Sequence, residues 1–336
     1  MRRLLVAIRL TLGYAATLVV TAMRRTTHPP LRPSWSVGDE ARSTFLRALW
    51  RRLHAMPVEE RRREMDSVPV LRPAALLRTT RRRASLAGVP VTWVTPRAGA
   101  EPRLVLYVHG GAFTIGSSHM VRDLLARLAL ASRARVLSVD YRLAPEHPWP
   151  AGLDDLRAVW RAALVEHAPS QVVLAGDSAG GNLVLALLTV LRDQGDPLPA
   201  GAVLLSPWVD LCCTAASFRT NADADFLHRE GMLRDAAGVA AGRDPGEPAL
   251  SPLRADLRGL PPLYLQTGGA ELLRDDVEAF ATRARSAGVQ ATLDVWEDQV
   301  HDFQTFGALS RKSLEAITQA GEAVQVFAPV LRMTRG

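Results

Sequence analysis

The sequence predicts an α/β fold with a mainly parallel central sheet covered by helices on both faces. Short apolar stretches, which are typical of buried strands, alternate with longer stretches of helical periodicity. Two of the apolar stretches run directly into glycine-rich turns. With 336 residues, of which 48% are hydrophobic, the chain can bury a large core, which suits one main domain with an inserted or appended lid.

The elements follow from this alternation. Strands are expected at 91–94, 103–109, 134–140, 171–176, 201–206, 262–268 and 290–296, and helices at 120–132, 152–166, 179–194, 272–286 and 308–328. Two segments do not follow the alternation. Residues 35–85 are predicted to be helical and basic, and residues 208–256 separate the strands at 201–206 and 262–268 without a clear strand or helix pattern. We therefore divide the chain into an apolar and basic segment 1–27, a helical segment 28–84 and a main domain 85–336 with an insertion at 208–256.

A glycine-flanked serine follows the expected strand at 171–176. Gly176-Asp177-Ser178-Ala179-Gly180 matches the G-x-S-x-G pattern, and a helical stretch comes directly after it. In this setting the glycines let the strand and the helix backbones approach closely, and the serine hydroxyl is exposed on a sharp turn. Ser178 is therefore the candidate nucleophile. The non-catalytic alternative is a glycine-rich helix N-terminus that only packs or holds an anion.

A second glycine-rich loop, His109-Gly110-Gly111, ends the expected strand at 103–109. An acyl-transfer site needs backbone N–H groups directed at the developing oxyanion, and such a loop supplies them. We expect Gly110 and Gly111 to donate from this loop and Ala179 from the turn at Ser178. His109 itself is interpreted as a structural residue that shapes the loop.

The candidate base is His301, in the loop after the expected strand at 290–296. His228, the other histidine beyond Ser178, is interpreted as a surface residue. Glu271 follows the strand at 262–268 in a loop, where an acid that orients the imidazole should lie. Asp275 is the second candidate acid, although a carboxylate at the start of a helix also has a structural role.

Taken together, these motifs resemble the hormone-sensitive-lipase-like family of α/β-hydrolase esterases. The resemblance covers roughly residues 85–330 and rests on five stretches, namely 107–113, 140–151, 176–181, 206–211 and 301–303. Many members carry Asp-Pro-Leu-x-Asp in the acid loop, and the register places Glu271 where the first aspartate stands. Glutamate is an accepted acid in this fold.

The resemblance implies a helical cap formed by the two irregular segments and a carboxylic ester hydrolase of short to medium acyl chains. In that mechanism Ser178 attacks the ester carbonyl, His301 takes its proton and Glu271 orients the imidazole. The oxyanion lies against Gly110, Gly111 and Ala179, and water then frees the acyl group. No metal or organic cofactor is expected.

Charge and cysteine content bear on partners and location. The net charge is +7, yet residues 1–83 carry 18 arginines and 6 acidic residues, so the basic excess is N-terminal. Runs such as Arg61 to Arg63 and Arg81 to Arg83 are interpreted as solvated helix faces, and no aromatic residues interleave them as nucleic-acid binding would require. Cys212 and Cys213 are adjacent, which indicates reduced thiols in a cytoplasmic protein.

The first 23 residues do not determine whether the chain contacts a membrane. Leu10 to Met23 is an apolar stretch bounded by arginines on both sides, short for a membrane span and only loosely like a signal peptide. We favour a helix that lies on the core or touches a membrane surface. A translation start at Met23 would remove the segment. A small-molecule ester is the expected partner, and a homodimer is compatible with the sequence.

Two other functions use the same residues. A lactone hydrolase or an acyltransferase would need the same three side chains, because pocket shape and water access choose the acceptor. A ligand-binding receptor on this fold would have lost the histidine, so the presence of His301 argues against it.

Overall fold

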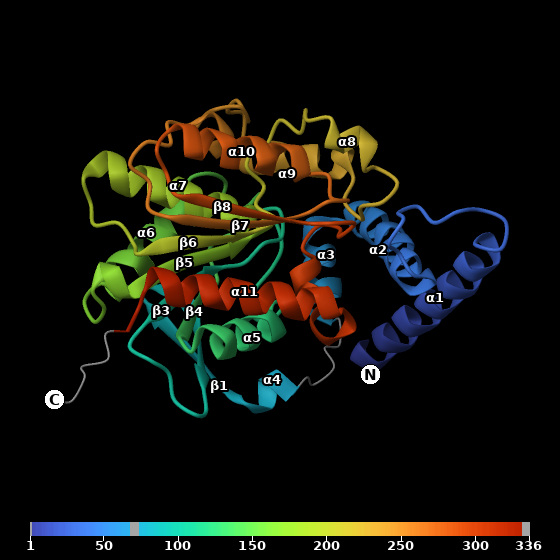
Figure 1. The fold of residues 1–336 in the computed structure, drawn as a ribbon, viewed down its shortest axis with the longest axis horizontal. Helices are drawn as coiled ribbons and strands as arrows, with labels where there is room; N and C mark the ends of the chain where they lie inside the picture. The colour runs from blue at the N-terminus through green and yellow to red at the C-terminus, as the bar shows by residue number, and fades with distance from the viewer. Residues whose placement is uncertain (1, 68–73, 331–336) are drawn as a thin grey trace.

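An eight-stranded sheet in the order β1-β2-β4-β3-β5-β6-β7-β8 forms the centre of the computed structural model, which describes residues 2–67 and 74–330 (Figure 1). Its strands are β1 Thr79–Leu86, β2 Val89–Pro96, β3 Leu104–Val108, β4 Arg135–Val139, β5 Val172–Asp177, β6 Gly201–Leu205, β7 Leu263–Gly268 and β8 Ala291–Trp296. β2 is antiparallel to β1 and β4, and the other neighbours are parallel. The predicted α/β class with a mainly parallel sheet is confirmed.

Helices cover both faces of the sheet (Figure 1). They are α1 Arg2–Arg24, α2 Val37–His54, α3 Val58–Ser67, α4 Ala74–Leu77, α5 Arg122–Ser132, α6 Ala151–Ala163, α7 Ser178–Gln194, α8 Ser217–Thr220, α9 Arg229–Ala240, α10 Arg274–Ser286 and α11 Arg311–Phe327, with 3₁₀ turns at 169–171, 252–254 and 303–309. α5 and α11 pack on one face, and α6, α7 and α10 pack on the other.

The side chains of β3 show why this sheet is buried on both faces. Val105 and Tyr107 join the core with α5 and α11, whereas Leu104, Leu106 and Val108 join the core on the opposite face. This is the two-residue period of a strand. All five residues are at most 1% exposed, so the strand reads as a continuous apolar run, as parallel strands between two helical layers do.

The prediction that residues 35–85 are helical is wrong over its last part. Thr79–Leu86 is the edge strand β1, joined to β2 by Ala87 and Gly88, which have φ of 52° and 81°. Two residues of positive φ form the tight turn that suits a two-residue hairpin. The arginines of β1, which are exposed, mark a protected sheet edge rather than a helix face.

Helices α1 and α2 lie beyond one end of the sheet, and α2 is the nearer of the two to the sheet (Figure 1). α1 packs against α2, and the ring of Tyr14 meets that of Phe45 edge-on at 6.0 Å. Within α1, Val6–Arg24 is long and apolar enough to cross a membrane by length and composition. The stretch is a single helix, and one of its sides packs on α2.

Candidate active site

Ser178 lies on the turn between β5 and α7, and its backbone φ is 51°. A residue with a side chain rarely adopts this conformation, so the turn is strained. The two flanking glycines are required by close backbone approach. A Cβ on Gly176 would come within 2.6 Å of the Gly180 carbonyl carbon, and a Cβ on Gly180 would overlap the carbonyl of Val108. The turn therefore has the geometry that the sequence pattern predicts.

The structure brings His301 to Ser178 from 123 residues further along the chain. The Nε2 atom of His301 lies 3.0 Å from the Ser178 hydroxyl oxygen, and its side chain is almost fully buried. The same Nε2 also lies 3.2 Å from a carboxylate oxygen of Asp302. A nucleophile and a base within hydrogen-bond distance are the pair that acyl transfer needs.

Glu271 lies on the other side of the imidazole. Its Oε2 is 4.0 Å from Nδ1 of His301, and the side chain is fully buried. Three donors hold the carboxylate, namely the hydroxyls of Ser206 and Thr267 at 2.7 and 2.6 Å and the N–H of Gly268 at 3.0 Å. Among the described residues, Nδ1 of His301 makes no hydrogen bond. Glu271 is thus positioned beside the base, just beyond hydrogen-bond distance.

The carboxylate of Asp275 is held by another segment of the chain. Its carboxylate accepts a hydrogen bond at 2.8 Å from the backbone N–H of Ser217, and it lies in the first turn of α10. There it stabilises the helix start and joins α10 to α8.

Asp225 is a buried carboxylate that sequence reasoning missed. It accepts hydrogen bonds from the backbone N–H groups of His301 at 3.2 Å and Leu272 at 2.8 Å, so it ties the loop of the base to that of Glu271. Burial raises the pKa of Asp225. No local signal distinguishes this aspartate, because it lies in a polar stretch of the insertion and its partners are 47 and 76 residues away.

The electrostatics of His301 are dominated by neighbouring carboxylates. Burial lowers the pKa of His301, but the negative charges of Asp302, Glu271 and Asp225 outweigh this effect and raise the pKa to about 9. Burial also raises the pKa of Glu271 to about 7, although the positive charge of His301 counteracts it. Imidazole and carboxylates therefore stabilise each other's charged forms.

The three expected oxyanion donors lie in two segments that meet beside Ser178, because a Cβ on Gly110 would overlap the carboxylate of Asp177, the residue before Ser178. Gly110 and Gly111 lie in the loop after β3, and Ala179 is the second residue of α7. Gly111 has a φ of 116° and lines the same cavity as Ser178. His109 is buried and stacks on Tyr141 with the ring centres 4.5 Å apart, which is consistent with a structural residue.

A cavity of about 350 Å³ opens over Ser178 and His301. Most of its wall is apolar and comes from the N-terminal helices and from the insertion. These apolar wall residues are Leu10, Phe45, Leu46, Leu49, Trp50, Met65, Trp208, Phe226, Leu227 and Met232. Such a wall suits the hydrocarbon part of an ester. Segments 28–84 and 208–256 thus both contribute to the space above the candidate nucleophile.

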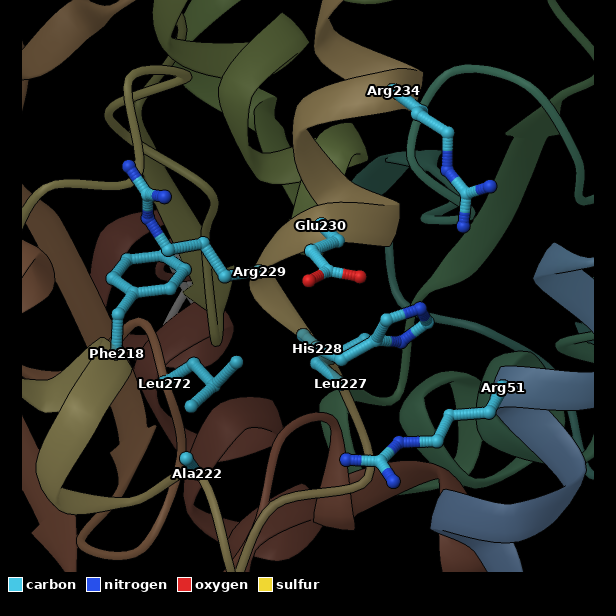
Figure 2. A pocket seen from close by; sticks show the side chains of 9 residues that line it. All are labelled: Arg51, Phe218, Ala222, Leu227, His228, Arg229, Glu230, Arg234 and Leu272. Carbon is cyan, nitrogen blue, oxygen red and sulfur yellow. The ribbon is translucent and has the colours of Figure 1, made fainter.

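A second cavity of about 490 Å³ lies beside the first and shares Leu227 with it. Figure 2 shows Arg51 and Arg234 reaching toward His228 from α2 and α9. His228 is therefore not a simple surface residue: it is partly buried, and its ring meets His54 edge-on at 4.7 Å. Burial and the nearby His54 and arginines lower the pKa of His228 to about 4, so its imidazole is neutral.

The interpretation of Arg61 to Arg63 as a solvated face is wrong for Arg61. This side chain is buried and donates at 2.8 Å to Asp235 of α9 and at 2.7 Å to the hydroxyl of Thr114. Arg62 donates at 2.8 Å to the carbonyl of Thr114 and pairs with Glu146. Thr114 follows the His-Gly-Gly loop, so α3 holds that loop against α9.

Nothing in the described ranges, 2–67 and 74–330, groups three histidine, cysteine or acidic side chains as a metal site would. The thiols of Cys212 and Cys213 are both free. Cys213 is buried, whereas Cys212 is partly exposed.

Comparisons with known proteins bear on the fold and on the reaction class. Residues 105–305 match a family described as alpha/beta hydrolase fold. An acetyl-hydrolase of Streptomyces hygroscopicus is 42% identical over 231 residues, which are 68% of this chain and 77% of that protein. An esterase of Acinetobacter venetianus is 37% identical over 242 residues, 70% and 79% of the two chains. The crystal structure of an esterase from the bacterial hormone-sensitive lipase family superposes with a TM-score of 0.79 at 39% identity, over 86% of this chain and 98% of that one.

Proposed function

This chain belongs to the α/β-hydrolase family, and we propose that it cleaves short to medium acyl esters through Ser178. It resembles the hormone-sensitive-lipase esterases within that family and is a carboxylic ester hydrolase. The observation that carries the proposal is the 3.0 Å separation of Ser178 Oγ and His301 Nε2 beneath an apolar cavity. Two relatives in sequence are named an acetyl-hydrolase and an esterase, which supports the reaction class.

In the proposed mechanism the Ser178 oxygen attacks the ester carbonyl while His301 Nε2 takes the hydroxyl proton. The negative charge that develops on the carbonyl oxygen is stabilised by the N–H groups of Gly110, Gly111 and Ala179. His301 then gives its proton to the leaving alcohol, and an acyl-enzyme remains on Ser178. Water, deprotonated by the same imidazole, attacks this acyl-enzyme and releases the carboxylic acid.

Glu271 is the proposed acid of the triad. Its carboxylate faces the Nδ1 side of the imidazole and is the fixed negative charge that an imidazolium needs there. A movement of a few tenths of an ångström to about an ångström would close the hydrogen bond, as catalytic contacts often tighten when substrate binds. The acid assignment is supported further by Asp275, whose carboxylate is engaged by Ser217 instead.

The test is hydrolysis of p-nitrophenyl esters from acetate to palmitate by the wild type and by Ser178→Ala. We expect activity to be highest on the shorter chains and to fall by several orders of magnitude in the variant. A folded wild type that is inactive on every chain length would contradict the short-chain proposal. Hydrolysis of lactones only, or transfer of the acyl group to an added alcohol in place of water, would then favour the lactone hydrolase or the acyltransferase.

We further propose that segments 28–84 and 208–256 form the cap over residues 85–336, since both line the cavity above Ser178. We place the enzyme in the cytoplasm, with peripheral membrane contact through residues 1–27. A homodimer stays compatible with this arrangement, and sedimentation of the purified protein measures it.

A further inference from the structure

α1 has two different faces. On the inner face Val6 and Thr21 are buried, and Tyr14 packs on Phe45 of α2. The outer face carries large apolar side chains that no described part of the chain covers: Ile8 is 46% exposed, Leu12 65%, Val19 55%, Val20 65% and Met23 68%. An uncovered apolar face of this kind is unusual on a soluble protein and marks an interaction surface.

The exposed side chains form a stripe. With 3.6 residues per turn, Ile8, Leu12, Val19 and Met23 fall within about 60° of each other around the helix axis. The positions between them on this side include Ala15 and Ala16, which are also exposed. We call Ile8, Leu12, Ala15, Ala16, Val19 and Met23 the outer stripe. It runs along four turns of α1 and contains no charged side chain.

The charge of the surrounding segment indicates what covers the outer stripe. Residues 1–67, which contain α1, α2 and α3, carry 13 arginines and 6 acidic residues, so the segment that includes α1 has a net charge of +7. A lipid bilayer with anionic headgroups complements both features, because its surface attracts arginines and its interior accepts apolar side chains. A nucleic acid would leave the apolar stripe uncovered.

Ion pairs indicate that α1 lies along the surface rather than across the bilayer. Arg24 and Arg25 both pair with Glu40 of α2, which is 1% exposed, and Arg25 does so at 3.0 Å. Arg9, within the apolar part of α1, pairs with Glu64 of α3 at 3.3 Å. A spanning helix would have to break these contacts and carry Arg9 into the hydrocarbon region.

The same helix forms part of the wall of the catalytic cavity. Leu10 lines this cavity, and it is two residues from Ile8, about 200° around the helix. One helix, about 10 Å in diameter with its side chains, therefore separates the outer stripe from the space above Ser178. Substrate that is dissolved in a bilayer would be held next to the cavity.

We infer that α1 docks this enzyme on an anionic bilayer surface through the outer stripe, and that the catalytic cavity takes its esters from that bilayer. The supply of substrate rests on the proposed esterase function, whereas docking does not. The natural substrates are then esters of low water solubility that partition into membranes.

The experiment compares the wild type with Leu12→Glu/Val19→Glu on phosphatidylcholine vesicles with and without phosphatidylglycerol. Val165→Glu/Val326→Glu is the matched control, because both valines are highly exposed, at 85% and 74%, but lie outside α1. We expect the wild type and the control to sediment with the phosphatidylglycerol vesicles, less so at high salt, and the α1 variant to bind at least about tenfold more weakly, as two buried charges imply. Circular dichroism checks that all three are folded.

Activity separates docking from catalysis. All three proteins should hydrolyse a soluble p-nitrophenyl ester equally, and only the α1 variant should lose the rate on a long-chain ester dissolved in the vesicles. Equal vesicle binding by the two double variants would overturn the inference. A wild type that does not bind vesicles, but forms a dimer that Leu12→Glu/Val19→Glu dissociates, would also overturn it. A wild type that alkaline carbonate cannot extract from the vesicles would overturn it too, because α1 would then span the bilayer. If none of the proteins hydrolyses any ester, the proposed esterase function is contradicted, and vesicle binding still tests docking.

Discussion

The carboxylate of Glu271 lies 4.0 Å from Nδ1 of His301, and the Ser206 hydroxyl donates at 2.7 Å to the oxygen that is nearest to the imidazole. The carboxylate is therefore fixed by its neighbours before any substrate is present. A carboxylate that is already fixed beside the base requires little reorganisation when the imidazole becomes charged.

Replacing Glu271 with alanine should lower kcat by roughly 10⁴-fold, because removal of a triad acid leaves the imidazolium without its counter-charge. Asp275→Ala should change kcat by only a few-fold, since Asp275 binds Ser217. Steady-state kinetics on one soluble ester measure both effects. A crippling Asp275→Ala together with a mild Glu271→Ala would show that the acid is misassigned.

The pH dependence of kcat/KM should reveal the carboxylates around His301. A general base accepts a proton only in its neutral form, and the carboxylates of Asp302, Glu271 and Asp225 raise the pKa of His301 to about 9 despite its burial. We therefore expect kcat/KM to rise as the pH increases and to level off above about 9. A pH profile measured with a neutral ester checks this.

Asp302→Asn tests whether the carboxylate of Asp302 raises the pKa of His301. Asp302 raises the pKa of His301 more than the other carboxylates do, so its loss should move the rising limb of the profile to lower pH. Near neutral pH a larger fraction of His301 is then neutral. A profile that does not move would mean that Asp302 does not control the base.

The contact of Arg61 with Asp235 and Thr114 predicts that α3 positions the oxyanion loop. Arg61→Met removes one partner of a buried ion pair, which should cost about 3–5 kcal/mol of unfolding free energy. Because Thr114 loses its donor, kcat should also fall at temperatures where the variant is folded. Denaturant unfolding and kinetics measure the two effects.

Arg63→Met is the matched control for Arg61→Met, because Arg63 belongs to the same run but is exposed. It should leave both stability and kcat nearly unchanged. If Arg61→Met lowers stability and leaves kcat intact, α3 only holds the cap in place and does not position the loop.

Local patterns in the sequence could predict most of the site. The turn at Ser178 is specified by neighbours within four residues, and each strand that ends beside the site is a short apolar run with a turn after it. His301 could be found because the chain order of this fold places the base last. These features depend on the period of side chains and on backbone space, both of which are legible in a single sequence.

Other features depend on contacts between distant segments and could not be predicted. Arg61 reads as part of a basic run, yet its partner Asp235 is 174 residues away and makes it a buried cation. Asp225 carries no signal in the sequence, because the backbone N–H groups of Leu272 and His301 that donate to it are 47 and 76 residues away. β1 was mistaken for helix because its arginines mask the strand pattern, and only pairing with β2 defines it.

The geometry of Gly111 gives a way to test the oxyanion loop, whose donors are backbone groups. Gly111 has a φ of 116°, and a Cβ there would overlap the carbonyl of Ile115, so Gly111→Ala must displace the loop. If its N–H stabilises the oxyanion, kcat should fall about 10²–10³-fold.

The control is Gly88→Ala, where φ is also positive, at 81°, but no atom lies within 4 Å of the new Cβ. That variant carries the same kind of backbone strain and should lose about 1 kcal/mol of stability with kcat unchanged. Equal kcat values in the two variants, with both folded, would remove Gly111 from the oxyanion hole, because strain alone would then account for everything the substitution does.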